Sequence, residues 1–180
     1  MSGDDRLAAA RALVPIVHAA LRERSATLAV AESLTGGLLA VLLTDVAGAS
    51  VTFRGGVVPY ATPLKAALLG VPEDLLAERG AVDPDVALAM ADGAAGRLAA
   101  TYGLAATGVA GPDPQDGKPV GTVYVAYSRQ VGAEPLPPRA SRVREHRFSG
   151  GRAEIRAAAA TAALELLAQA LSPGTRPLPG

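Results

Sequence analysis

The sequence predicts an α/β fold: a three-layer α/β/α sandwich with a mixed sheet. Segments with helical periodicity alternate with short runs of strand formers, and two strand-like segments follow one another late in the chain. Hydrophobic residues make up 49% of the 180 residues but aromatic residues only 3%. Ala, Val and Leu must therefore fill the interior, which favours close packing of helices on a sheet. The length suits one domain, expected at residues 1–172 and followed by a flexible tail at 173–180.

The first half of the chain is predicted to contain two helices and two strands. They are expected at residues 5–24 (helix), 27–31 (strand), 35–46 (helix) and 50–60 (strand). Pro15 should kink the first helix or split it in two. Ser33 or Thr35 is the expected cap of the second helix. The pair Gly55-Gly56 predicts a bulge, or a place where the backbone approaches a ligand closely.

The middle of the chain is predicted to hold three helices. They are expected at residues 62–69, 72–79 and 83–102. The first and third begin with a capping residue followed by proline, a combination that favours the first helical turn. A glycine is expected to end each helix, at Gly70, Gly80 and Gly103.

The last part of the chain is predicted to contain a short strand, a long loop, two neighbouring strands and a final helix. These are expected at residues 104–107, 108–119, 120–128, 141–148 and 150–171. The loop is too rich in Gly and Pro for regular structure, and loops of this length are usually functional or disordered. Residues 131–138 should connect the two strands, and residues 172–180 should form a frayed tail.

Two of the predicted segments meet the sheet where binding sites usually lie. In open α/β sheets, ligands bind outside the carboxyl ends of the strands. Ser33 follows the first predicted strand, and the loop that begins at Gly108 follows the third. We therefore expect both segments to face one crevice.

Ser33 has two interpretations, one structural and one functional. A serine before a helix is most often an N-cap, worth about 1 kcal/mol. Gly36 and Gly37 follow it, however, and each glycine weakens a helix by about 1 kcal/mol, which a capping role does not explain. Glycines at this position let a ligand reach unpaired N–H groups, an arrangement that suits an anion or a carbonyl under nucleophilic attack.

Other residues of interest carry the same two kinds of interpretation. Tyr60 and Lys65 are spaced so that both can point the same way, and a desolvated lysine acts as the base in serine–lysine hydrolases. The alternative interpretation is that Tyr60 simply ends a strand and that Lys65 is a solvated helix residue. The segment 107–111 (Thr-Gly-Val-Ala-Gly) and Arg152 either bind a phosphate or form a plain turn and a surface cation.

Composition excludes several function classes. The 17 basic and 17 acidic residues balance, which argues against nucleic acid as a partner, and the basic residues at 139–147 fit an exposed strand face. The chain has no cysteine, so disulfides, thiolate zinc sites and a cysteine nucleophile are excluded. The only histidines, His18 and His146, are interpreted as structural or surface residues, and no metal is expected.

The sequence shows no targeting or membrane-spanning segment. The N-terminus is acidic and lacks the basic and apolar regions of a signal peptide. No apolar stretch is long enough to span a bilayer. We expect a cytoplasmic protein that does not associate with membranes.

Several ordered blocks of sequence resemble a known family. The chain from about residue 27 to 167 is similar to the nicotinamide-nucleotide amidases of the PncC type, equivalent to the carboxyl-terminal domain of the CinA competence/damage-inducible proteins. The blocks are Ala-Glu-Ser-Leu-Thr-Gly-Gly at 31–37, Phe-Arg-Gly-Gly-Val-Val-Pro-Tyr at 53–60, Lys65 with Leu-Gly-Val at 69–71, Gly-Ala-Val at 80–82, Thr-Gly-Val-Ala-Gly-Pro-Asp at 107–113, Lys-Pro-Val-Gly-Thr-Val at 118–123 and Phe-Ser-Gly-Gly-Arg at 148–152.

The resemblance implies a reaction and a set of roles. The chain would deamidate nicotinamide mononucleotide to nicotinate mononucleotide and ammonia in pyridine-nucleotide salvage, with neither metal nor redox cofactor. Ser33 would be the nucleophile, Lys65 its base, and Tyr60 would relay or orient the proton. We expect N–H groups around Thr35, Gly36 and Gly37 to stabilise the oxyanion, and Arg152 with the loop residues Thr107, Gly108 and Gly111 to bind the phosphate. A homo-oligomer is a further implication of the family.

The chain also departs from the family pattern. Leu34 stands where the family usually has cysteine, Pro-Gln-Asp-Gly at 114–117 replaces a glycine-rich run, and Gly151 replaces an aspartate. These changes concern substrate affinity more than reaction type. The alternative function is a non-catalytic nucleotide-binding module, and a lesser variant is an amidase of free nicotinamide or another small carboxamide.

Overall fold

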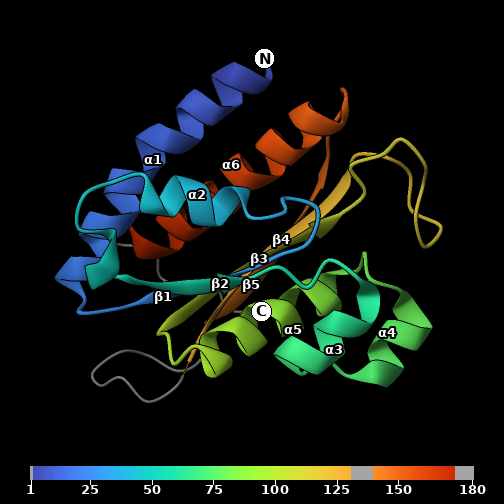
Figure 1. Ribbon diagram of the computed structural model, residues 1–180, viewed down its shortest axis with the longest axis horizontal. Coiled ribbons are helices and arrows are strands. Elements are labelled where there is room, and N and C mark those ends of the chain that lie inside the picture. The colour runs from blue at the N-terminus through green and yellow to red at the C-terminus, as the bar shows by residue number, and fades with distance from the viewer. Residues whose placement is uncertain (1, 131–139, 173–180) are drawn as a thin grey trace.

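The computed structural model describes residues 2–130 and 140–172, and a five-stranded mixed sheet forms its middle layer (Figure 1). The strands are β1 (Leu28–Glu32), β2 (Phe53–Val57), β3 (Tyr102–Gly108), β4 (Thr122–Arg129) and β5 (Ser141–Arg147), in the spatial order β2-β1-β3-β4-β5. β1 pairs in parallel with β2 and β3, whereas β4 pairs antiparallel with β3 and β5. The predicted α/β class with a mixed sheet is confirmed.

Helices cover both faces of the sheet. One face carries α1 (Gly3–Glu23), α2 (Leu38–Thr44) and α6 (Arg152–Leu171), and the other carries α3 (Thr62–Leu69), α4 (Glu73–Arg79) and α5 (Pro84–Arg97), as Figure 1 shows. A short 3-10 helix, η1 (Ala49–Val51), precedes β2. None of the described helices is long and apolar enough to cross a membrane.

Each face of the sheet has its own hydrophobic core. Alternate residues of β1 divide between the two cores, because successive strand side chains point to opposite faces. Leu28 and Val30 pack with α1, α2 and α6, while Ala29 and Ala31 pack with α5. Buried alanines of α6 (157–160) let that helix lie close to the rest of its core, so small side chains fill the interior as predicted.

The prediction that Pro15 splits the first helix in two is wrong. α1 runs continuously from Gly3 to Glu23 with Pro15 inside it. Pro15 lies on the exposed side of the helix, and so does Arg11, whose carbonyl loses its helical partner to the proline ring. Water can solvate that carbonyl, so the helix tolerates the proline.

The third predicted helix of the middle segment ends earlier than expected. α5 stops at Arg97, and Tyr102 and Gly103 begin β3 instead of ending a helix. Gly103 is needed for packing, because a Cβ there would collide with the carbonyl oxygen of Ala91 in α5. The glycine therefore marks a close approach between helix and strand, and the prediction that it ends a helix was wrong.

The second helix and second strand are also shorter than predicted. α2 begins only after Gly37, and β2 covers residues 53–57 of the predicted 50–60. An irregularity is present next to the expected Gly55-Gly56: Leu28 of β1 pairs with Phe53 and Ala29 with Gly55, so the register skips Arg54. A Cβ on Gly56 would lie 2.7 Å from Cγ2 of Val30, so the close approach is to the neighbouring strand and not to a ligand.

The later elements agree with prediction to within about two residues at most boundaries. β4, β5 and α6 occupy the expected places, and residues 109–121 form the expected irregular loop. β3 is longer than predicted because it includes residues 102 and 103. The predicted connection at 131–138 and the tail at 173–180 lie outside the described residues.

Candidate active site

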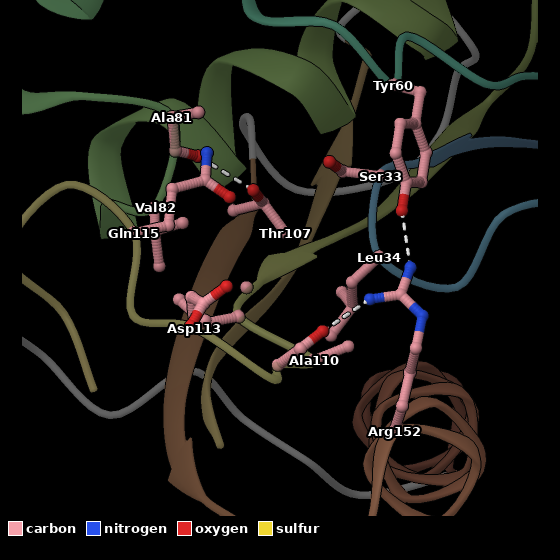
Figure 2. Close-up of a pocket in the computed structure, with 13 residues that line it drawn as sticks. Ser33, Leu34, Tyr60, Ala81, Val82, Thr107, Ala110, Asp113, Gln115 and Arg152 are labelled. Carbon is pink, nitrogen blue, oxygen red and sulfur yellow. Dashed lines mark hydrogen bonds between the residues drawn. The ribbon is translucent and has the colours of Figure 1, made fainter. Parts of the chain in front are cut away.

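A pocket lies at the carboxyl ends of β1 and β3, where the sequence analysis expects a crevice. Its walls come from the turn after β1 (Ser33 and Leu34), Tyr60 before α3, residues 81–82 after α4, the loop 107–115, and Arg152 of α6 (Figure 2). The space between these walls, including the open mouth, is about 470 Å³. The Ser33 turn and the loop that begins at Gly108 do therefore face one pocket.

Ser33 and Lys65 are in direct contact. Nζ of Lys65 donates a hydrogen bond to Oγ of Ser33 at 3.2 Å and another to the carbonyl oxygen of Pro59 at 2.9 Å. Lys65 is only 1% exposed, on the face of α3 that packs against the protein. The hydroxyl that opens into the pocket thus has a buried amine directly behind it.

Burial changes the proton affinity of that amine. Desolvation lowers the pKa of Lys65 to about 8, and the negative charge of Asp116 opposes this effect by raising it. At a pKa of about 8, roughly a tenth of the amine is neutral at pH 7, whereas an ordinary lysine is almost entirely protonated. Lys65 is therefore able to accept a proton under mild conditions.

The turn that carries Ser33 is held by Glu32, a residue that the sequence analysis did not single out. Its buried carboxylate accepts hydrogen bonds from the N–H groups of Gly37, Leu39 and Ala40 at 2.9–3.0 Å. Glu32 thereby does for α2 what a capping side chain does for other helices, since the residue at the N-cap position is Gly37. The expectation that Ser33 or Thr35 caps this helix was therefore wrong, and the available signal for Glu32 was an acidic residue at the end of an apolar strand, just before a helix.

The expected roles of Thr35, Gly36 and Gly37 change in the structure. The N–H of Gly36 donates to the carbonyl of Ser33 at 3.1 Å and that of Gly37 donates to Glu32, so neither N–H is available to a ligand. Both glycines have positive φ (60° and 95°), which explains their identity without a ligand. Thr35 is fully buried, and none of the three lines the pocket.

Thr107 and Asp116 hold one side of the pocket together. The Thr107 hydroxyl donates to the carbonyl of Ala81 at 2.7 Å, and the Ala81 N–H donates to Asp116 at 2.7 Å. The backbone of Ala81 is thus tied through its C=O to β3 and through its N–H to the loop that follows β3. Thr107 lines the pocket, but its hydroxyl is engaged with the protein.

The loop glycines have packing reasons of their own. A Cβ on Gly108 would lie 2.5 Å from the carbonyl oxygen of Thr122 on β4, and Gly111 has a φ of +85°. Both residues still line the pocket, so the backbone of the loop forms one of its walls.

Arg152 and Tyr60 meet across the mouth of the pocket. Arg152 donates from Nη2 to the Tyr60 hydroxyl at 2.5 Å and from Nη1 to the carbonyl of Gly111 at 2.8 Å, as Figure 2 shows. Tyr60 is 55% exposed. Within residues 2–130 and 140–172 its hydroxyl makes no hydrogen bond to Ser33 or Lys65, so the structure joins it to Arg152 and not to the expected proton path.

The two histidines lie away from this pocket. His18 is buried between α1, α2 and η1, and His146 on β5 stacks on the ring of Phe148. In the described part of the chain, no three His, Asp or Glu side chains gather into a set that could hold a metal ion.

Comparisons with known proteins place this geometry in a family. A model of the CinA C-terminal domain matches residues 10–171. A CinA-like protein of Frankia casuarinae is 53% identical over 157 residues, covering 87% of this chain and 34% of the relative. A CinA-like protein of Geobacter sulfurreducens is 50% identical over 151 residues, covering 83% and 35%. The chain thus spans about a third of the length of these curated relatives.

Solved structures agree with these sequence matches. A competence/damage inducible protein of Agrobacterium tumefaciens is 36% identical with a TM-score of 0.82, covering 91% of this chain and 95% of that one. A competence damage-inducible protein of Klebsiella pneumoniae is 29% identical with a TM-score of 0.83, covering 92% and 99%. The chain therefore belongs to the CinA C-terminal domain family.

Proposed function

We propose that this chain is a serine-dependent amidohydrolase that converts nicotinamide mononucleotide and water to nicotinate mononucleotide and ammonia, in pyridine-nucleotide salvage. The contact between Lys65 and Ser33 carries the proposal, because it joins a buried amine of lowered pKa to a hydroxyl in a pocket. The substrate follows from the family resemblance of the sequence blocks.

The first half of the reaction forms an ester with Ser33. Neutral Lys65 accepts the hydroxyl proton of Ser33 as Oγ attacks the carboxamide carbon of the substrate. The C=O electron pair moves to oxygen and gives a tetrahedral oxyanion. When this intermediate collapses, the C–N bond breaks and Lys65 returns the proton to the leaving nitrogen, which departs as ammonia.

The second half releases the product. A water molecule attacks the ester carbon while Lys65 accepts its proton, and the second tetrahedral intermediate expels Oγ of Ser33. The proton on Lys65 returns to Oγ, and the released carboxylic acid gives its own proton to water or ammonia and leaves as nicotinate mononucleotide. The same amine serves both halves, which requires a pKa close to the working pH, as burial gives Lys65.

The remaining pocket residues bind and orient the nucleotide in this proposal. The guanidinium of Arg152 and the backbone at Gly108 and Gly111 receive the phosphate at the mouth of the pocket. Tyr60 holds Arg152 in place through their hydrogen bond. Thr107, Thr35 and the two glycines after it act on the shape of the backbone and do not contact the substrate.

Ammonia release tests the proposal. The purified chain should release ammonia from nicotinamide mononucleotide, and the Ser33→Ala and Lys65→Met variants should lose at least about a thousand-fold in kcat. Ser50→Ala, which changes an exposed serine outside the pocket, is the matched control and should keep full activity. The proposal is contradicted if the wild-type chain releases no ammonia from any pyridine nucleotide.

Calorimetry and a substrate comparison separate the remaining candidates. Tight binding of the nucleotide without ammonia release would favour the non-catalytic nucleotide-binding module. Faster release of ammonia from free nicotinamide than from the nucleotide would instead favour an amidase of small carboxamides.

A further inference from the structure

Most backbone N–H groups of the turn at residues 33–37, which carries Ser33, already donate to an acceptor within the protein. The N–H of Ser33 donates to the carbonyl of Ala106 at 2.9 Å. Gly36 donates to the carbonyl of Ser33, and Gly37 donates to Glu32. Those of Leu34 and Thr35 find no acceptor among residues 2–130 and 140–172, and Leu34 lines the pocket beside Ser33.

Arg156 of α6 holds the opposite side of the same turn. Its Nε donates to the carbonyl oxygen of Leu34 at 3.0 Å, and its Nη2 donates to that of Thr35 at 2.6 Å. Arg156 is half-buried, one helical turn beyond Arg152, and it does not line the pocket. Its guanidinium therefore contacts the backbone next to Ser33 and does not reach the space that a substrate would occupy.

Because the peptide bond is planar, the two contacts of Arg156 also orient the N–H groups of Thr35 and Gly36. The described peptide bonds are trans except Gly111–Pro112, so a C=O and the N–H of the next residue point in opposite directions. By holding the carbonyl of Leu34, Arg156 turns the N–H of Thr35 away from α6. By holding the carbonyl of Thr35, it turns the N–H of Gly36 the same way, toward the carbonyl of Ser33.

The Gly36 contact extends this control to a third peptide plane. The Ser33 carbonyl that accepts from Gly36 belongs to the same peptide unit as the N–H of Leu34. Fixing that carbonyl fixes the direction of the Leu34 N–H. One guanidinium thus orients, directly or through one hydrogen bond, both N–H groups that lack an acceptor beside the nucleophile.

We propose that Arg156 is a positioning residue for the reaction at Ser33, which holds the N–H group of Leu34, the one of the two that lies at the pocket, as a donor that stabilises the oxyanion. The proposal rests on the proposed amidase function. It moves the oxyanion donor from the expected Thr35–Gly37 segment to Leu34. It also gives the planar, two-pronged guanidinium a task that a lysine cannot perform.

Three variants and two readouts test this role. Arg156→Met removes both hydrogen bonds, Arg156→Lys keeps the charge but not the planar pair, and Arg24→Met is the matched control. Arg24 also donates to a backbone carbonyl, that of Ala20, but it lies at the end of α1 away from the pocket. The readouts are kcat and KM for ammonia release, and the rate at which a fluorophosphonate probe labels Ser33.

The Met variant should lose about 100-fold in kcat and in labelling rate, and the Lys variant about tenfold. KM should change by less than about threefold, since Arg156 does not line the pocket. Added guanidinium ion should restore part of the activity of Arg156→Met and none in Arg24→Met. The proposal is overturned if Arg156→Lys reacts like the wild type, if KM carries the loss, or if guanidinium restores nothing to a folded Met variant.

The probe keeps this test separate from the substrate question. A wild-type chain that is labelled at Ser33 but releases no ammonia has the wrong assigned substrate, and the labelling rates still decide the role of Arg156. A wild-type chain that is neither labelled nor active overturns both proposals. Should the Met variant fail to fold, the Lys variant decides on the same two readouts.

Discussion

The carboxylate of Asp116 accepts a hydrogen bond from the N–H of Ala81 at 2.7 Å, although 35 residues separate them. This contact fixes a negative charge on the loop after β3. The charge acts on Lys65 and raises its pKa, against the larger lowering by burial. A residue in the segment that departs from the family pattern thus influences the proposed base.

Replacing Asp116 should shift the pH dependence of the reaction to lower pH. With the wild type, kcat/KM should rise with pH and level off above about 8, because neutral Lys65 is the active form. Asp116→Asn keeps an oxygen acceptor for Ala81 but removes the charge that raises the Lys65 pKa. The midpoint of the profile should therefore fall below that of the wild type.

The control for this shift is Glu73→Gln, which removes an exposed negative charge at the start of α4. Its pH profile should match the wild type. An unchanged or raised midpoint in Asp116→Asn would show that Asp116 does not act on the base.

Tyr60 and Arg152 should behave as one unit. Arg152→Met should raise KM for nicotinamide mononucleotide by about tenfold or more, and should change KM for nicotinamide riboside, which lacks the phosphate, far less. Tyr60→Phe removes the hydroxyl that accepts from Arg152, so it should add little to the Arg152→Met variant. Additive losses in kcat for the double variant would instead place Tyr60 on the proton path with Lys65.

Two glycines one turn apart on α5 should respond in opposite directions to alanine. A Cβ on Gly93 would collide with the carbonyl oxygen of Leu69, so Gly93→Ala should lower the free energy of unfolding by about 2–3 kcal/mol. Gly96 has nothing within 4 Å of such a Cβ, so Gly96→Ala should raise it by roughly 0.5–1 kcal/mol. Urea denaturation measures both changes, and equal effects would mean that α5 packs differently against α3.

The sequence was sufficient for the fold class because the relevant signals are local. Periodicity, caps and turn residues each reflect neighbouring positions, and together they predicted most helices and strands with the correct type. They failed at Gly103, where the reason for glycine is a helix that lies across the strand in space. A single sequence does not distinguish such a contact from a helix terminator.

The residues of the candidate site also divide into those that local sequence signals predict and those that only the three-dimensional structure shows. Ser33 was singled out because it lies at a strand-to-helix turn, and Lys65 because its spacing lets it point the same way as Tyr60 and a desolvated lysine can act as a base. Glu32, Asp116 and Arg156 act through hydrogen bonds to backbone groups elsewhere in the fold. Bonds of this kind leave no spacing pattern in the sequence, since any polar side chain at the right place in the structure can make them.

His18 should make the stability of the fold depend on pH. Its Nε2 donates to the carbonyl of Leu43 at 2.9 Å, which leaves Nδ1 to accept from the hydroxyl of Thr52. The ring is 0% exposed, and burial lowers its pKa, with the Leu43 carbonyl opposing and Arg22 assisting. Below the ordinary histidine pKa of about 6.5 the unfolded chain takes up the proton more readily than the folded chain.

The contribution of His18 to the free energy of unfolding should therefore stay constant above about pH 6.5. It should fall as the pH drops below that value. His18→Gln lacks the titrating ring, so its stability should fall less between pH 8 and about 5.5 than that of the wild type. His146→Gln is the necessary comparison, because burial also lowers the pKa of that ring and gives the same sign. Urea denaturation at several pH values measures each slope. If His18→Gln loses as much stability as the wild type over this range, the proton that limits folding in mild acid binds elsewhere.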